Sequence, residues 1–347
     1  MLQNANIMTD TLDYALSNAL KWAEDFFPGD SPITFSPLDG DGSQRRYIRL
    51  FRDNKTIMLL LGPVESENRL WLYLGQKLWY HGLPLPQIFE ADLTEGRFLL
   101  EDLGHIRLDK VTSDLAWPHC NLARPLAYLL ADWHDRALTA VGSLGSSNPP
   151  YDQNLAMELE WRYFANGLRL LNLKNAHLAD DLSHEALELS CLATSAGDLV
   201  LIHRDFQSRN LMLYKDKIEG DKIMVIDWQG ARLGPAPYDL SSLLNDPYVN
   251  VTEDIKQTFL EHYQSARKSK MPAAFKTQLL SLGALRMMQA FGAYVNLTIV
   301  KKKMGYRDYL FPALERLRLI LSASPLGHLK GLRNLVDKIT MDLSVGQ

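Results

Sequence analysis

Residues 203–210 read His-Arg-Asp-Phe-Gln-Ser-Arg-Asn, and an apolar stretch over 199–202 leads directly into them. Transfer of a phosphoryl group to a hydroxyl needs a carboxylate that orients the hydroxyl and accepts its proton. It also needs oxygen ligands for a magnesium ion that offsets the charge of a triphosphate. Asp205 suits the first role, as catalytic base, and Asn210 suits the second. The segment therefore predicts a loop for phosphoryl transfer.

A second carboxylate follows at the end of another apolar stretch. Residues 224–227 read Met-Val-Ile-Asp, and a polar turn over 215–222 separates them from Asn210. We expect a hairpin whose two ends bring Asn210 and Asp227 together, with Asp227 as the principal ligand of Mg²⁺. These are the roles of the corresponding residues in the catalytic loop and the Asp-Phe-Gly motif of protein kinases, and the assignment follows that template.

The order of predicted elements indicates two lobes. A helix is expected over residues 10–27, and alternating patterns predict strands over 33–38, 46–51, 56–61, 88–91 and 97–100, with a helix over 66–81. Helices are then expected near 121–138, 154–173, 180–196, 252–268, 272–300 and 308–322, interrupted by a β-rich island over 198–227. We predict an α+β, protein-kinase-like fold. Its small antiparallel β N-lobe, with the N-terminal helix, occupies 1–102 and binds ATP, and its mainly helical C-lobe occupies 103–347 and holds the catalytic loop and acceptor pocket.

Composition narrows the class of protein. The chain has 347 residues, 46% of them hydrophobic, and its formal net charge is −4, which does not favour a nucleic-acid binder. Cys120 and Cys191 belong to no Cys/His cluster, so neither a disulfide framework nor a zinc site is expected. No signal peptide and no membrane-spanning apolar run is recognisable. We therefore expect a cytoplasmic monomer that binds neither membranes nor nucleic acids.

These motifs together resemble the aminoglycoside-phosphotransferase family, also called the choline-kinase-like group. The resemblance rests on HRDFQSRN at 203–210, VIDWQGARLGPAPYDLSSLL at 225–244 and LLADWH at 129–134, and it extends over roughly residues 30–325. Within this family, further segments resemble bacterial cell-wall sugar kinases that phosphorylate N-acetylmuramate and N-acetylglucosamine at the anomeric hydroxyl. These segments are LDGDGSQRRY at 38–47, PVESEN at 63–68, LLEDLG at 99–104 and QAFGAY at 289–294.

The resemblance implies an ATP site in the N-lobe. Gly40, Gly42 and Ser43 would form the loop over the phosphates, where small side chains let backbone N–H groups approach oxygen. Glu101 and Leu103 would lie at the hinge, where backbone groups meet the adenine.

The resemblance also implies that Glu67 pairs with a phosphate-binding cation. The expected third strand has no lysine to supply this cation, so Arg45, Arg46 or Arg49 must do so. Side chains alternate along a strand, so only one of Arg45 and Arg46 can face the cleft. The sugar kinases that the chain resembles keep the Arg-Arg-Tyr run, and Arg46 is the preferred candidate.

Other conspicuous residues are interpreted as structural. His203 should anchor the catalytic loop through hydrogen bonds, and Asp239 should cap the following helix and brace the loop. Trp133 and His134 should pack between helices. The stripe formed by Leu282, Leu285, Met288 and Phe291 should be core.

Three classes of function remain open. The first is a sugar kinase for the recycling of peptidoglycan, the second is an aminoglycoside or choline/ethanolamine phosphotransferase, and the third is a non-catalytic pseudokinase that serves as a binding module. No acidic residue lies between Glu261 and Asp308, whereas that stretch contains several cations, which favours a neutral or anionic acceptor over a polycation. The intact Asp205, Asn210 and Asp227 argue against a pseudokinase. A protein kinase is not expected, because no Ala-Pro-Glu motif follows Asp227.

Overall fold

The structure is a computed structural model, and it describes residues 14–38, 45–62, 66–114, 122–142, 148–195, 197–216 and 220–345. The chain divides into two compact units, Met1–Gly104 and His105–Gln347. The boundary expected from the sequence was 102/103. None of the described helices is both long and apolar enough to span a bilayer.

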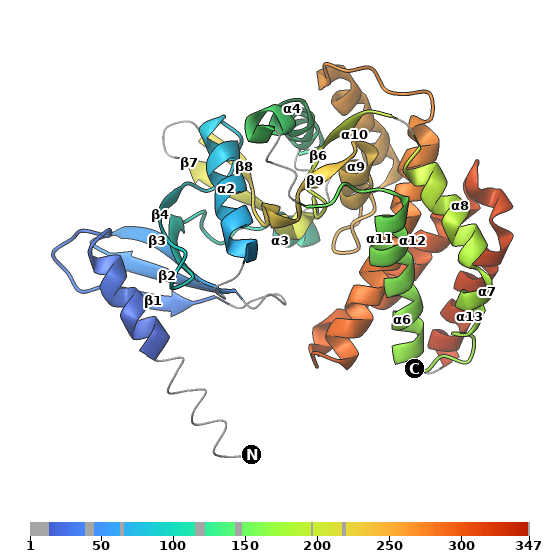
Figure 1. Cartoon of the computed structure of the whole chain (residues 1–347), viewed down its shortest axis with the longest axis horizontal. Helices are drawn as coiled ribbons and strands as arrows, with labels where there is room; N and C mark the ends of the chain where they lie inside the picture. Colours follow the sequence, from blue (N-terminus) through green and yellow to red (C-terminus); the bar gives the residue numbers. More distant parts are fainter. Residues whose placement is uncertain are drawn as a thin grey trace, which may run out of the picture. The chain divides into compact units, whose positions relative to one another are not determined.

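The first unit is built on a five-stranded antiparallel sheet (Figure 1). Its strands are β1 (Thr34–Pro37), β2 (Arg46–Arg52), β3 (Lys55–Leu61), β4 (Ile88–Asp92) and β5 (Arg97–Glu101), in the order β1-β2-β3-β5-β4. The predicted meander is thus confirmed for the first three strands, and β5 pairs with β3. A helix over residues 14–24 covers one face of the sheet, where Ala19 and Ala23 contact Ile48 and Leu50 in one apolar cluster. Helix α2 (Ser66–Tyr80) follows β3, as predicted.

The second unit is mainly helical, as predicted. Its described helices are α3 (Leu108–Asp114), α4 (Ala123–Val141), α5 (Gln153–Ala156), α6 (Arg162–Leu170), α7 (Leu178–Asp181), α8 (Ser183–Ala193), α9 (Pro237–Leu244), α10 (Glu253–Ala266), α11 (Phe275–Ile299), α12 (Leu310–Ser322) and α13 (Lys330–Val345). A π-helical turn, η3 (Met157–Trp161), joins α5 to α6. Two short ladders complete the unit, β6 (Leu199–Ile202) with β9 (Arg232–Pro235) and β7 (Leu211–Asp216) with β8 (Gly220–Val225). Helix α13 was not predicted.

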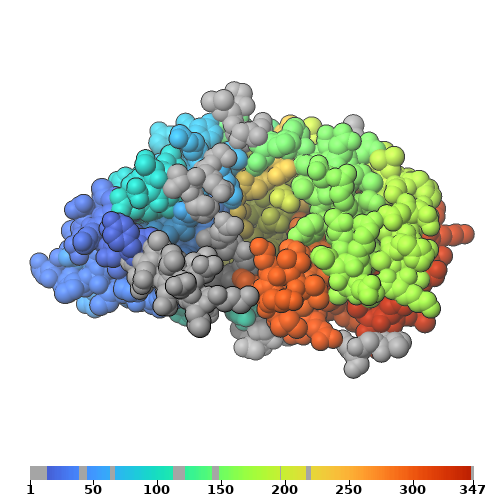
Figure 2. Space-filling view, turned by 60° about the horizontal axis from the view of Figure 1, so that its bottom comes forward, coloured from blue at the N-terminus to red at the C-terminus, as the bar shows by residue number. Residues whose placement is uncertain are grey.

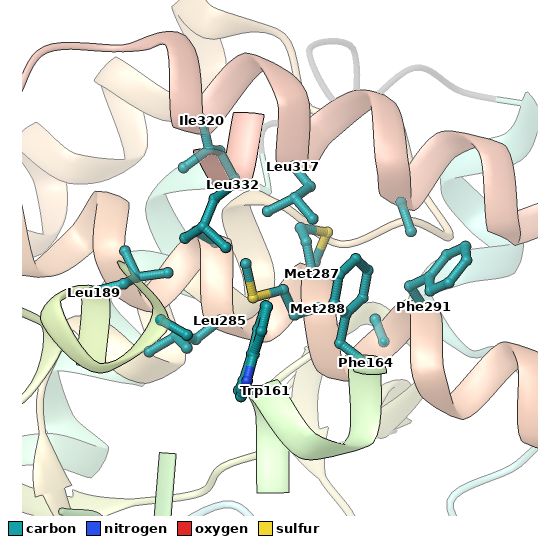
Figure 3. Close-up of a cluster of buried hydrophobic side chains, with 14 of the residues drawn as sticks. Trp161, Phe164, Leu189, Leu285, Met287, Met288, Phe291, Leu317, Ile320 and Leu332 are labelled. Carbon is teal, nitrogen blue, oxygen red and sulfur yellow. The ribbon is translucent and has the colours of Figure 1, made fainter. Parts of the chain in front are cut away.

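Helix α11 forms the centre of the second unit's core (Figure 3). Its predicted stripe is confirmed, because Leu282, Leu285, Met288 and Phe291 are fully buried. The rings of Phe291 and Phe164 lie 5.4 Å apart, which brings α6 against α11. Burying a side chain of this size contributes roughly 1.5–3 kcal/mol to stability. The core thus fixes the position of the long helix, which also carries polar residues toward the catalytic loop.

Candidate active site

The catalytic loop follows β6, a short apolar strand that pairs with β9. Its apolar residues Val200, Leu201 and Ile202 are buried. The chain then turns at Arg204, whose φ of 77° is unusual for a residue with a side chain. A backbone in this region is costly and persists only where its surroundings hold it. The loop ends in a single 3₁₀ turn, η4 (Ser208–Asn210).

Asp239 on α9 holds this strained turn. Its Oδ2 accepts a hydrogen bond from the backbone N–H of His203 at 2.7 Å, and its Oδ1 accepts one from the N–H of Arg204 at 2.9 Å. The bracing role predicted for Asp239 is therefore confirmed. The predicted capping role is wrong, because the side chain is used on the loop, and α9 has Ala236 at its N-cap position without a side-chain cap.

His134 and Trp133 were predicted to pack between helices. Both side chains also form hydrogen bonds that support the loop. His134 Nε2 lies 3.1 Å from Asp239 Oδ2, and its Nδ1 lies 2.7 Å from the hydroxyl of Tyr263. Trp133 Nε1 donates to the carbonyl of Leu201 at 2.9 Å, at the end of β6. Burial lowers the pKa of His134 below its ordinary value although Asp239 opposes the shift, so His134 is a neutral imidazole whose Nε2–H donates to the carboxylate of Asp239. Helix α4 thus supports the catalytic loop through both residues.

The predicted hairpin is confirmed, and it brings Asn210 beside the segment that contains Asp227. Leu211 pairs with Val225 at the base of the β7–β8 ladder, and Ile226 N–H donates to the carbonyl of Asn210 at 3.0 Å. His203 Nε2 lies 3.0 Å from the carbonyl of Ile226, which confirms its predicted anchoring role. The loop and the hairpin are therefore fastened to one another at the base of the hairpin.

Asn210 and Asp227 carry side-chain oxygen atoms at the base of this hairpin. Asn210 Nδ2 donates to the carbonyl of Asp205 at 2.9 Å, which leaves its Oδ1 as the atom able to contact a cation. Asp227 adopts a left-handed backbone with φ 68°, and its Oδ1 accepts from Gln229 Nε2 at 2.7 Å. Across the described residues there is no cluster of three or more His, Cys, Asp or Glu side chains that could hold a metal ion. This donor set suits Mg²⁺, which usually takes one or two protein oxygens together with water and phosphate oxygens.

Asp205 lies at the start of the same loop and pairs with an arginine from α11. Arg286 Nη2 lies 3.2 Å from Asp205 Oδ1, and the side chains of these residues are 5% and 30% exposed, respectively. Burial acts to raise the pKa of Asp205, but the positive charges of Arg204 and Arg286 outweigh it and hold the pKa below its ordinary value. Asp205 is therefore a partly accessible, ionised carboxylate.

Two further residues, neither of them predicted from the sequence, support the loop. Asp246 is fully buried, and it accepts hydrogen bonds from the backbone N–H groups of Ser208 and Tyr248 at 2.7 and 2.9 Å. Arg209 lies over the ring of Tyr248, with its guanidinium carbon 3.8 Å from the ring centroid, and donates to the hydroxyl of Tyr306 at 3.1 Å. The sequence shows an aspartate at 246 and an arginine inside the 203–210 motif. It does not show that Asp246 is buried, and the partners of both residues lie far along the chain.

The pairing of Arg286 also changes the charge argument made from the sequence. Two cations of the acid-free stretch 262–307 have acidic partners elsewhere in the chain. Arg286 pairs with Asp205, and Arg267 pairs with Asp198 and, at 3.1 Å, with Asp135. Lys301 and Lys302 are exposed, in the segment drawn in orange in Figure 2. The remaining basic character of this stretch therefore lies in its lysines and in Arg307, which is exposed.

The residues predicted for the nucleotide lie in the first unit. Gly40, Gly42 and Ser43 fall outside the described residues. Glu67 on α2 pairs with Arg45 at 3.2 Å, which corrects the expected pairing with Arg46, because β2 begins at Arg46 and Arg45 lies buried just before it. Arg46 itself lies in β2, opposite Leu61 of β3.

The stretch after β5 is held by a third arginine. Arg49 donates to both carboxylate oxygens of Asp102, at 2.7 and 3.0 Å, and to the carbonyl of Gly104 at 2.6 Å. Glu101 uses its side chain to accept from the N–H of Gln87, and Leu103 is buried. The hydrogen bonds of Arg49 therefore hold the segment that contains the expected hinge residues.

Comparisons with known proteins agree with this geometry. Residues 34–274 match the phosphotransferase enzyme family, APH. The chain is 26% identical over 319 residues to an N-acetylmuramate/N-acetylglucosamine kinase of Caulobacter vibrioides, with 81% of this chain and 86% of that protein covered. It is 25% identical over 325 residues to a protein of the same name from Neisseria meningitidis serogroup B, with 86% and 89% covered.

A solved structure shows the same fold. The chain resembles a choline kinase from Cryptosporidium parvum with a TM-score of 0.60 at 15% identity, and 90% of this chain and 92% of that one are covered. The matched family region contains the braced His-Arg-Asp loop, the hairpin and the Pro-Tyr-Asp segment that starts α9. The chain therefore belongs to the phosphotransferase enzyme family.

Proposed function

We propose that this phosphotransferase transfers the γ-phosphoryl group of ATP to the anomeric hydroxyl of N-acetylmuramate or N-acetylglucosamine, in the cytoplasm, during the recycling of peptidoglycan. The observation that carries the proposal is the arrangement of the second unit's catalytic loop. Asp205, Asn210 and the hairpin that ends at Asp227 are fastened together by Asp239 and His203. Such a set provides one carboxylate for the acceptor hydroxyl and two oxygen donors for a metal ion.

In this proposal, Asp205 orients the acceptor hydroxyl and takes its proton as the new oxygen–phosphorus bond forms and ADP leaves. Asn210 Oδ1 and Asp227 would hold Mg²⁺, which supplies positive charge to the phosphate oxygens when it is bound. Arg45 in the first unit takes the place of the missing third-strand lysine, since it forms the ion pair with Glu67. Gly40, Gly42, Ser43, Arg46, Glu101 and Leu103 remain proposed contacts of the nucleotide.

Two observations support an amino-sugar acceptor. The relatives that match most of the chain are named N-acetylmuramate/N-acetylglucosamine kinases. An anomeric hydroxyl is more acidic than other sugar hydroxyls, so it suits a base such as Asp205 whose basicity its arginine neighbours reduce. We also expect the chain to act as a monomer.

The test is a measurement of ATP consumption by the whole chain with Mg²⁺ and one of four acceptors, namely N-acetylmuramate, N-acetylglucosamine, kanamycin and choline. We expect saturable turnover with one or both N-acetylated sugars and a phosphorus NMR signal for a sugar 1-phosphate. Asp205→Asn is the matched control, and it should give no product. Turnover of kanamycin or choline with neither sugar, or a 6-phosphate product, would overturn the proposed acceptor.

A further inference from the structure

A buried carboxylate lies outside the catalytic loop and has no role in the function proposed above. Glu160 lies in the π-helical turn η3 and is fully buried. Its Oε2 accepts from the hydroxyl of Tyr151 at 3.0 Å, and its Oε1 accepts from the hydroxyl of Tyr238 at 2.7 Å. A buried charge is costly unless it is paired, and single π-helical turns occur frequently at functional sites. Core packing alone therefore does not explain why a carboxylate is buried at position 160.

A continuous chain of contacts leads from Glu160 to the catalytic loop. The hydroxyl of Tyr238 donates to Glu160 and accepts from Arg286 Nη1 at 3.3 Å. Arg286 Nη1 also donates to Gln289 Oε1 at 2.6 Å, and Arg286 Nη2 reaches Asp205 Oδ1 at 3.2 Å. Arg286 is 4% exposed and lies between the buried side chains of Leu285 and Met287 on α11. The guanidinium is thus held on one side by the Glu160–Tyr238 pair and on the other side by Asp205.

The charges of this chain alternate. Glu160 uses both oxygens as acceptors. Burial raises the pKa of Glu160, and the positive charge of Arg286 and the hydrogen bond from Tyr238 oppose that shift. Burial also raises the pKa values of both tyrosine hydroxyls, which keeps them protonated as donors. Arg286 therefore lies between two carboxylates, Glu160 at the far end and Asp205 at the site. Removing the middle member would leave two buried or partly buried negative charges without their cation.

The two oxygens of Asp205 differ in their surroundings. Oδ1 receives the Arg286 guanidinium, whereas no hydrogen bond from the described residues reaches Oδ2. A methyl group added at Gly230 would lie 3.8 Å from Oδ2 and 3.7 Å from Cδ of Arg204, so a glycine backbone borders this oxygen where a larger residue would contact the carboxylate. One oxygen of Asp205 is therefore held by Arg286, and the other accepts no hydrogen bond from the described residues.

We propose that Arg286, held in place by Glu160 through Tyr238, is a positioning residue that fixes the side chain of Asp205 so that Oδ2 meets the acceptor hydroxyl. The inference rests on the function proposed above for Asp205, and it adds the three residues that set its geometry. Arg286 acts through Asp205 and contacts no reacting atom. A misplacement of a reacting group by 1 Å can lower the rate on the order of 10²-fold, so the chain should affect kcat.

The first test compares Arg286→Ala, Arg286→Lys and Glu160→Gln in the whole chain. Arg286→Ala should lower kcat by roughly 10²-fold and change the KM for ATP less than about twofold, because the nucleotide contacts stay intact. Guanidinium ion added at millimolar concentration should restore about tenfold of the loss, and Arg286→Lys should retain part of the activity. Glu160→Gln should lower kcat by a smaller factor, about five- to tenfold, since Arg286 keeps its other partners.

Glu185→Gln is the matched control, because Glu185 also accepts two hydrogen bonds on a helix of the second unit, from the N–H groups of Gly331 and Leu332. It should keep the wild-type kcat and show no response to guanidinium. If urea titration shows that Arg286→Ala does not fold, the kcat values of Arg286→Lys and Glu160→Gln test the proposal. A kcat within threefold of wild type in folded Arg286→Ala would overturn the proposal, as would equal losses in Arg286→Ala and Arg286→Lys without rescue. If Arg286→Ala does not fold, unchanged kcat values in both Arg286→Lys and Glu160→Gln would overturn it.

The second test asks whether Arg286 acts through Asp205. In an Asp205→Ala background, Arg286→Ala should cost less than about twofold, because the carboxylate that it positions is absent. Radiolabelled ATP makes such slow turnover measurable. If the double variant loses kcat by the product of the two single-variant factors, Arg286 acts independently of Asp205, and the proposal is overturned.

Hydrolysis of ATP without a sugar separates this inference from the proposed function. With water as acceptor, loss of phosphate release in Arg286→Ala and its rescue by guanidinium would support the inference even if neither sugar is a substrate. Rapid phosphorylation of a sugar by Arg286→Ala would support the proposed function and overturn the inference.

Discussion

The Oδ2 atom of Asp239 accepts a hydrogen bond at 2.7 Å from the backbone N–H of His203, across 36 positions of sequence. Its other oxygen accepts from the next N–H in the chain, so one carboxylate holds two successive peptide groups at the strained turn before Asp205. Asp205, the proposed base, thus follows a turn held by Asp239, and its side chain contacts Arg286 at 3.2 Å.

Asp239→Asn should lower both stability and turnover. The amide keeps one acceptor oxygen but turns an N–H₂ group toward a backbone N–H, so a buried donor loses its partner. The expected loss is about 2–3 kcal/mol in the free energy of unfolding, measured by urea titration, and at least about tenfold in kcat. The same substitution at Asp152, which caps α5 by accepting from the N–H of Leu155, should cost almost nothing, because Asn caps about as well as Asp. Equal losses at both positions would contradict the bracing role.

His134 should make stability depend on pH between about 7 and 5. Burial lowers its pKa in the folded state, so the unfolded chain binds a proton near the ordinary value of 6.5 whereas the folded chain does not. The free energy of unfolding should therefore fall as the pH drops below about 6.5, and stop falling at the lower pKa of the folded state. Urea titrations at pH 7.5, 6 and 5 should show a smaller decrease for His134→Gln.

His328 supplies a control of opposite sign for this measurement. Its hydrogen bond with Glu188 raises its pKa, so its small contribution is present at low pH and is lost as the pH rises through the folded-state pKa. His328→Gln should therefore make the decrease at low pH slightly steeper. A wild-type chain whose decrease matches that of His134→Gln would contradict the assignment of a neutral, buried His134.

Asp205→Asn should abolish most turnover and leave folding nearly unchanged. The amide retains an acceptor for Arg286 but cannot take a proton, and losses of this kind are typically about 10²–10⁴-fold in kcat. The measurement is steady-state kcat with the active acceptor, together with a urea titration. A kcat close to that of wild type in the folded variant would show that Asp205 is not the base.

Asp227→Ala should remove activity and raise the magnesium concentration required for any that remains, and Asn210→Ala should do so less completely. Asp227 brings a full negative charge to the ion, whereas Asn210 brings only a carbonyl dipole. A magnesium titration of kcat checks this, with Asp221→Ala, an exposed acid on the same hairpin, as control. Unchanged magnesium dependence in both site variants would refute the metal assignment.

Arg45→Ala should raise the KM for ATP more than Arg46→Ala does. Arg45 is buried and pairs with Glu67, whose side chain is 53% exposed, so removing Arg45 deletes the cation of the pair and leaves a solvated glutamate. We expect an increase of about tenfold for Arg45→Ala and less than about threefold for Arg46→Ala, from initial rates at varied ATP. The reverse order would restore Arg46 as the cation for the nucleotide.

Features that depend on local spacing are readable from the amino-acid order alone. The His-Arg-Asp loop, the hairpin that returns to Asp227 and the strands of the first unit are each encoded within a few tens of residues. Their apolar periods and turn residues therefore predict them. Helix α13 carried the same kind of signal, since Leu332, Leu335, Val336 and Ile339 recur at helical spacing and are buried.

Only the tertiary structure decided which distant side chains meet the loop. Arg286 lies 81 positions from Asp205, and His134 lies 105 positions from Asp239, so no local pattern relates them. Their contacts depend on how α4, α9 and α11 pack around β6, and packing is set by the summed burial of many side chains. The pairing of Glu67 with Arg45 had the same origin, because it depends on where β2 begins and which side chain the core then encloses.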